Sequence, residues 1–72
     1  MSALDYYAER PEALDRILNN RACISTCHTD FQTLIATPSY AAIKARAKQA
    51  NYTVQLLAAE TGTINLKFSR LF

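Results

Sequence analysis

The residues most suited to chemistry in this sequence lie in one short stretch, where Cys23, Cys27 and His28 are followed by Asp30. A structural zinc ion takes four ligands in a tetrahedron, usually supplied as two spaced pairs. This stretch has three candidates, of which only Cys27 and His28 are adjacent, and the chain has no second cluster, so we expect no metal site and no cofactor. Two cysteines are too few for a disulfide framework, and we interpret them as reduced thiols.

The same stretch holds residue types found at nucleophilic sites: Ser25, Cys27, His28 and Asp30. A catalytic triad needs side chains that converge on a shaped pocket, whereas neighbours along a chain usually diverge. The chain has one histidine and one glycine, which also excludes a glycine-rich phosphate loop. We therefore expect that the protein is not an enzyme.

A second set of candidate residues is basic and lies in the C-terminal half. Residues 40–50 are rich in alanine and lysine, which favours a helix. At 100° per residue, Lys44 and Lys48 share one flank of this helix and Arg46 lies on the other. Ser39 is the expected N-cap, and the exposed N–H groups at a helix start bind anions. These residues are candidates for contacts with phosphate.

The remaining positions of this helix divide into two faces by the same geometry. The predicted buried stripe contains Tyr40, Ile43, Ala47 and Ala50, and the predicted outward face contains Ala41, Ala45 and Gln49. An outward face of small residues bordered by lysines can approach a phosphate backbone closely.

Two helices are predicted before the cysteine stretch. The first is capped by Ser2, carries Asp5 in its first turn and continues through Leu4, Tyr7 and Ala8. The second begins at Pro11, because proline suits the first helical position, and ends at Asn19-Asn20. Its core-facing stripe consists of Leu14, Ile17 and Leu18. Residues 21–28 fit either a short strand or the tail of this helix.

A third helix and a hairpin complete the predicted order. Thr29 or Asp30 caps a helix through Phe31, Leu34 and Ile35, which Pro38 closes. From Asn51 the apolar period changes to two, which predicts strands over residues 52–58 and 63–72 with a turn at 60–62. The fold class is therefore α+β, with about four short helices followed by a C-terminal β-hairpin in a winged-helix-like order.

Charge divides along the same line. Residues 1–36 carry five acidic and three basic side chains, and residues 37–72 carry five basic and one acidic, Glu60. The order of a helix pair followed by a hairpin resembles a winged helix-turn-helix, although Glu60 at the hairpin turn is unsuited to phosphate. We hypothesise a small regulatory nucleic-acid-binding protein whose DNA contacts come from Ser39, Lys44, Arg46, Lys48, Lys67 and Arg70.

The alternative is a small protein-binding inhibitor or adaptor of the kind encoded by phages and plasmids. Its interface would use Tyr6, Tyr7, Leu71 and Phe72, and the second hairpin strand as a sheet edge for a host protein or a second copy. The 72 residues fit a single small domain. No apolar run is long enough to cross a bilayer, and an acid near the N-terminus is unlike a signal peptide, so we expect a cytoplasmic protein.

Overall fold

A computed structural model describes residues 3–71 of the chain. Within them the order is α1 (Ala3–Glu9), α2 (Pro11–Asn19), β1 (Cys23–Ser25), α3 (Phe31–Ile35), α4 (Pro38–Gln49), β2 (Tyr52–Ala58) and β3 (Ile64–Arg70). The predicted α+β class with four helices and a C-terminal hairpin is confirmed. The segment left open by the sequence contains a strand, β1, which precedes α3. The predicted cap Ser2 lies outside the described residues.

The three strands form one antiparallel sheet in the order β1-β3-β2. The prediction that the second hairpin strand is a sheet edge is therefore wrong, since β3 lies in the centre and both β1 and β2 are edges. β3 pairs with β2 along seven residues but with β1 along only three, from Cys23↔Lys67 to Ser25↔Asn65. Residues 68–70 of β3 consequently extend beyond the end of β1.

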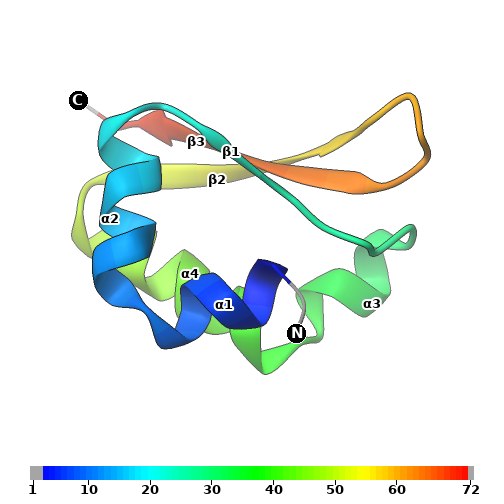
Figure 1. The fold of residues 1–72 in the computed structure, drawn as a ribbon, viewed down its shortest axis with the longest axis horizontal. Helices are drawn as coiled ribbons and strands as arrows, with labels where there is room; N and C mark the ends of the chain where they lie inside the picture. The colour runs from blue at the N-terminus through cyan, green and yellow to red at the C-terminus, as the bar shows by residue number, and fades with distance from the viewer. Residues whose placement is uncertain (1–2, 72) are drawn as a thin grey trace.

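The helices cover one face of this sheet. In Figure 1, α1, α3 and α4 lie below the strands and α2 stands at the left, reaching their level. The hairpin turn and α3 lie at the right, whereas the ends of α2, α4 and β3 gather at the left. Side chains on the covered face form the core with the helices: Leu4, Leu14, Leu18, Ile24, Leu34, Tyr40, Ile43, Ala47, Ile64, Leu66 and Phe68. None of the helices in residues 3–71 is long and apolar enough to span a bilayer.

The start of α4 differs from the prediction. Thr37 and not Ser39 is the N-cap, because the Thr37 hydroxyl accepts from the Tyr40 N–H at 3.1 Å and Pro38 takes the first helical position. The same hydroxyl donates to the Leu34 carbonyl at 2.8 Å, so one threonine ends α3 and begins α4. Ala50 is exposed because the helix ends before it, which corrects its predicted burial.

Three other local predictions agree with the structure, whereas the strand predicted over residues 63–72 is found as the shorter Ile64–Arg70. α2 begins at Pro11, and Asp30 caps α3 by accepting from the Thr33 N–H at 3.0 Å. The hairpin turn falls where the only glycine stands, and Gly62 has a φ of 87°, a conformation that glycine adopts without strain.

Candidate functional site: two cationic hollows at one end of the sheet

The structure divides the predicted basic surface. Arg46 is engaged by α2, since its Nε and Nη2 donate to the two carboxylate oxygens of Asp15 at 3.3 and 2.9 Å. This hydrogen-bonded pairing with Asp15 raises the pKa of Arg46, and the nearby negative charge adds to the effect. Ser39 lies within α4, where its hydroxyl donates to Asp5 of α1. The charge of Asp5 at the start of α4 disfavours an anion there.

Lys44 and Lys48 remain on the exposed surface of α4, as predicted. They line a hollow of about 300 Å³ between α4 and the edge of the sheet, which we call the α4–β2 hollow. Its other lining residues are Tyr52, Thr53, Val54 and Leu71. The hollow is therefore largely apolar, with two ammonium groups among its lining side chains.

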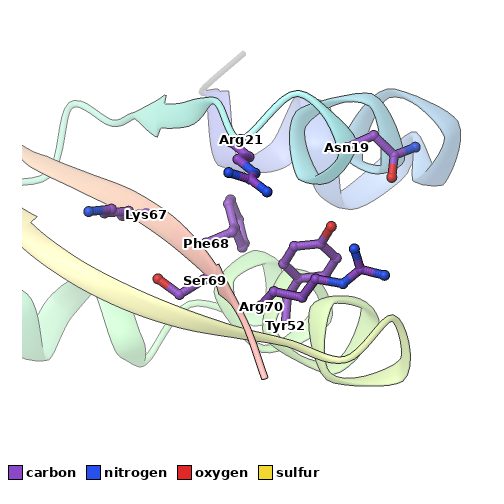
Figure 2. A pocket seen from close by; sticks show the side chains of 7 residues that line it. All are labelled: Asn19, Arg21, Tyr52, Lys67, Phe68, Ser69 and Arg70. Atoms are coloured by element: carbon purple, nitrogen blue, oxygen red, sulfur yellow. The ribbon is translucent and has the colours of Figure 1, made fainter. Parts of the chain in front are cut away.

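The other predicted cations, Lys67 and Arg70, line a separate and larger hollow of about 510 Å³. We call it the β3 hollow, and its remaining lining residues are Asn19, Arg21, Tyr52, Phe68 and Ser69. Figure 2 shows the Arg21 guanidinium directed toward the Phe68 ring, with the Tyr52 hydroxyl turned to the same space. Arg70 extends beside Tyr52, and Lys67 lies farther along the strand with its ammonium directed away from the other labelled side chains. Three basic residues from two distant segments thus line one hollow.

The β3 hollow exists because β1 is shorter than β3 and does not pair with its C-terminal residues. β1 begins at Cys23, so no strand pairs with residues 68–70 of β3 on that side. The chain before β1 turns sharply at the end of α2, where the Arg21 N–H donates to Leu18 O at 3.3 Å and the Ala22 N–H to Ile17 O at 3.1 Å. These two hydrogen bonds together form a Schellman motif, in which the residue after the helix C-cap adopts the left-handed conformation. Arg21 has the corresponding φ of 56°.

Neither hollow is lined by an acidic side chain. Within residues 3–71, the ion pairs closer than 4 Å join Arg10 to Glu9 and Arg46 to Asp15. The cations of the two hollows therefore have no carboxylate partner among the described residues. Tyr52 lines both hollows, so the two are neighbours on the surface.

Sequence reasoning missed Arg21. Its position in the first half of the chain grouped it with the acidic residues, and only the pairing of β1 with β3 places it at the hollow that Lys67 and Arg70 also line. A weak local signal exists, because Arg21 follows the helix-ending pair Asn19-Asn20, where a left-handed residue is common.

The cysteine stretch forms β1 and the loop between β1 and α3. Cys23 and Cys27 are free thiols on exposed positions, and the His28 carbonyl accepts from the Ile64 N–H at 2.9 Å. Among residues 3–71, no group of three His, Cys, Asp or Glu side chains is placed to hold a metal ion. Asp30 serves as a helix cap, and the hydrogen bonds from the Thr33 hydroxyl and N–H lower the pKa of its carboxyl.

The residues proposed for a protein interface come from α1 and from the C-terminal end of the chain. Tyr6 and Tyr7 meet edge to face in α1 with centroids 5.1 Å apart, and the Arg10 guanidinium lies 4.3 Å from the Tyr6 ring centre. Tyr7 packs against the core. Leu71 lines the α4–β2 hollow, and Phe72 lies outside the described residues.

Comparisons of this chain with protein-family models, curated proteins and solved structures give no match. The winged-helix-like order accordingly stays a prediction. What the protein binds has to be argued from the two hollows themselves.

Proposed function

We propose that this protein binds nucleic acid by contacting phosphates with Arg21, Lys67 and Arg70 of the β3 hollow. Lys44 and Lys48 of the neighbouring α4–β2 hollow extend the same cationic end of the molecule. The observation that carries the proposal is the gathering of three cations around one hollow that no acidic side chain lines. Arg46 is left out of the contact surface because Asp15 already engages its guanidinium.

Electrostatics supports an anionic ligand at this place. Like charges around a common space repel one another, and the repulsion is offset when an anion enters. Arginine presents a planar fork of N–H donors that matches a phosphate, and Asn19, Ser69 and Tyr52 add neutral donors at the same hollow. Binding of a polyphosphate chain is strengthened further because each neutralised phosphate releases counterions.

The backbone at Arg21 also supports a binding role. An L-residue other than Gly, Asn or Asp in the left-handed region is disfavoured by roughly 1–2 kcal/mol. A helix end of this kind usually carries glycine. An arginine at this position is explained if its cationic side chain is needed for binding, although its backbone conformation is unfavourable.

The order of the elements favours duplex DNA as the nucleic acid. A helix pair, α3 and α4, is followed directly by the β2–β3 hairpin, and the outward face of α4 has the small exposed residues Ala41 and Ala45. Such a face permits close approach to a groove, with positioning contacts to phosphate outnumbering contacts to bases. The proposal includes a regulatory role in the cytoplasm, where the free thiols Cys23 and Cys27 would stay reduced.

A titration of the full chain against fluorescent mixed-sequence duplex DNA tests this proposal. We expect binding at low salt that weakens with a slope of log K against log salt of about −3 to −4. Arg21→Gln, Lys67→Gln and Arg70→Gln should each weaken binding several-fold and reduce the slope by about one. Arg46→Gln removes the same charge and serves as the matched control, which we expect to bind almost as the wild type does.

Two results would overturn the proposal. One is the absence of binding at about 50 mM salt, where even non-specific phosphate contacts are measurable. The other is an Arg46→Gln variant that weakens binding as much as the three hollow variants, because net charge alone would then explain the affinity.

A further inference from the structure

The edge strand β2 is unprotected, in contrast to the edge strands of most monomeric proteins. Its seven residues contain no proline and no charged side chain, and its register with β3 is continuous from Tyr52↔Arg70 to Ala58↔Ile64, with no bulge. Sheet edges are usually blunted by one of these devices, because a row of open N–H and C=O groups pairs readily with another chain. The opposite edge, β1, has only three residues.

The hydrogen bonds at the two ends of the hairpin show which residues of β2 face outward. The Leu71 N–H donates to Asn51 O and the Ala59 N–H donates to Thr63 O, both at 2.8 Å. Residues of alternate number in an antiparallel strand direct their backbone groups to the same side. Odd-numbered residues of β2 therefore bond to β3. The even-numbered residues direct their N–H and C=O groups away from the sheet, and these are Tyr52, Val54, Leu56 and Ala58.

We propose that a second copy of this chain pairs with β2 in antiparallel fashion about a two-fold axis at Gln55, which joins two three-stranded sheets into one of six strands. This register uses the outward backbone groups of both copies, since Val54 lies opposite Leu56 of the second copy and Leu56 opposite its Val54. Tyr52 then lies opposite Ala58, so a large side chain meets a small one. No like charges face each other, because β2 has none.

The same register covers the α4–β2 hollow. Val54 and Tyr52 lie on the helix-covered face of the sheet, as their partners Phe68 and Arg70 show, and both line this hollow. Leu56 and Ala58 of the second copy come beside them on that face. The apolar lining from Val54 and Leu71 is then removed from water by an aliphatic side chain of matching character, which is favourable at roughly 25 cal/mol per Å².

Charge is complementary at the ends of the paired strands. Continuing the register past Ala58 brings Glu60 of the second copy opposite Ala50, at the end of α4. Lys48 lies two residues before that point and lines the hollow. Glu60 is the only acidic residue in positions 37–72. Two-fold symmetry repeats the Glu60–Lys48 approach, so a single register places both acidic turns beside lysines.

The mass of the full chain in solution tests the pairing without any nucleic acid, so its outcome is separate from that of the DNA titration. We expect sedimentation equilibrium to show a concentration-dependent species of twice the 8.1 kDa chain. Gln55→Lys sets two lysines against each other at the axis and should weaken association by about tenfold or more. Gln32→Lys makes the same change on the exposed surface of α3, and we expect it to associate as the wild type does.

A charge exchange tests the register itself. Glu60→Lys and Lys48→Glu should each weaken association, and the double variant should recover much of the loss because opposite charges face again. Far-UV circular dichroism checks that each variant is folded. A chain that stays monomeric at every concentration, or a dimer that Gln55→Lys leaves unchanged, would overturn the proposal. A double variant as weak as the single ones would overturn the Gln55 axis.

Discussion

Both α2 and α4 are followed by a residue in the left-handed conformation, but the two residues differ in type. α2 passes through Asn20 into Arg21 with a φ of 56°, and α4 passes through Ala50 into Asn51 with a φ of 66°. At both ends the left-handed residue donates its N–H to the carbonyl three residues earlier, at 3.3 Å in α2 and 3.0 Å in α4. Each turn then delivers the chain to an edge strand of the same sheet.

The difference lies in what the left-handed residue contributes. Asparagine tolerates this conformation, so Asn51 serves the turn from α4 into β2 at little energetic cost. Arginine tolerates it less well, but Arg21 lines the β3 hollow together with Lys67 and Arg70. The end of α4 is thus suited to stability, and the end of α2 sacrifices some stability to place a charge. The comparison can be tested at both helix ends.

The largest expected effect comes from the side chain that anchors the end of α2. Leu18 is 2% exposed, and Leu18→Ala removes buried methyl groups and leaves a cavity, at a cost of about 2–5 kcal/mol. The corresponding anchor of α4 is Ala47, which is fully buried, and Ala47→Gly should cost about 1 kcal/mol. Urea denaturation measures both. Equal losses would contradict the view that the two ends are held to the core differently.

Arg21→Gly sharpens the comparison directly. Glycine relieves the strained conformation, so we expect the variant to be more stable by about 1 kcal/mol while it binds DNA several-fold more weakly. The matched variant Asn51→Gly should change stability by only a few tenths of a kcal/mol and leave DNA binding unaltered. Thermal unfolding and the duplex titration give the two readouts. An Arg21→Gly variant that is less stable than the wild type would contradict the trade of stability for charge.

A smaller effect, on the pH dependence of stability, is expected from Asp30 at the start of α3. Hydrogen bonds from Thr33 lower the pKa of Asp30 below its ordinary value of 3.8, so the folded state favours the ionised carboxyl. The stability that this interaction contributes is fully present when the pH is above the ordinary pKa of Asp30. It is lost as the pH falls through the lowered pKa of the folded state. Asp30→Asn keeps a capping oxygen but removes the titration. We expect its unfolding temperature to change less than that of the wild type on acidification, and parallel curves would show that Asp30 contributes nothing.

Much of the fold was predictable because its signals are local. Pro11 marks the start of α2, Asp30 caps α3, and the alternation of Val54 and Leu56 with Thr53 and Gln55 marks β2. The mistaken cap at Ser39 came from the same kind of reasoning. Thr37 and Ser39 are both good caps, and Pro38 fits the first helical position, which selects Thr37.

The candidate site was predictable only in part. Lys44 and Lys48 lie on the exposed flank that helical geometry assigned to them, because that assignment depends on neighbouring residues alone. Helical geometry placed Arg46 on the other flank. Its ion-pair partner Asp15 belongs to α2, and no pattern in the sequence predicts that contact. The same holds for Ser39 and Asp5 of α1.

The sequence by itself determined the α+β class, the limits of most helices, the hairpin and its turn at Gly62, because capping, proline geometry and apolar period act over a few residues. Only the tertiary structure decided that β1 pairs with β3, that β2 becomes an open edge and that Arg21 lines the same hollow as Lys67 and Arg70. The partner of β1 cannot be predicted from its three residues, because the pairing is stabilised by burial of Ile24 in a core assembled from the whole chain.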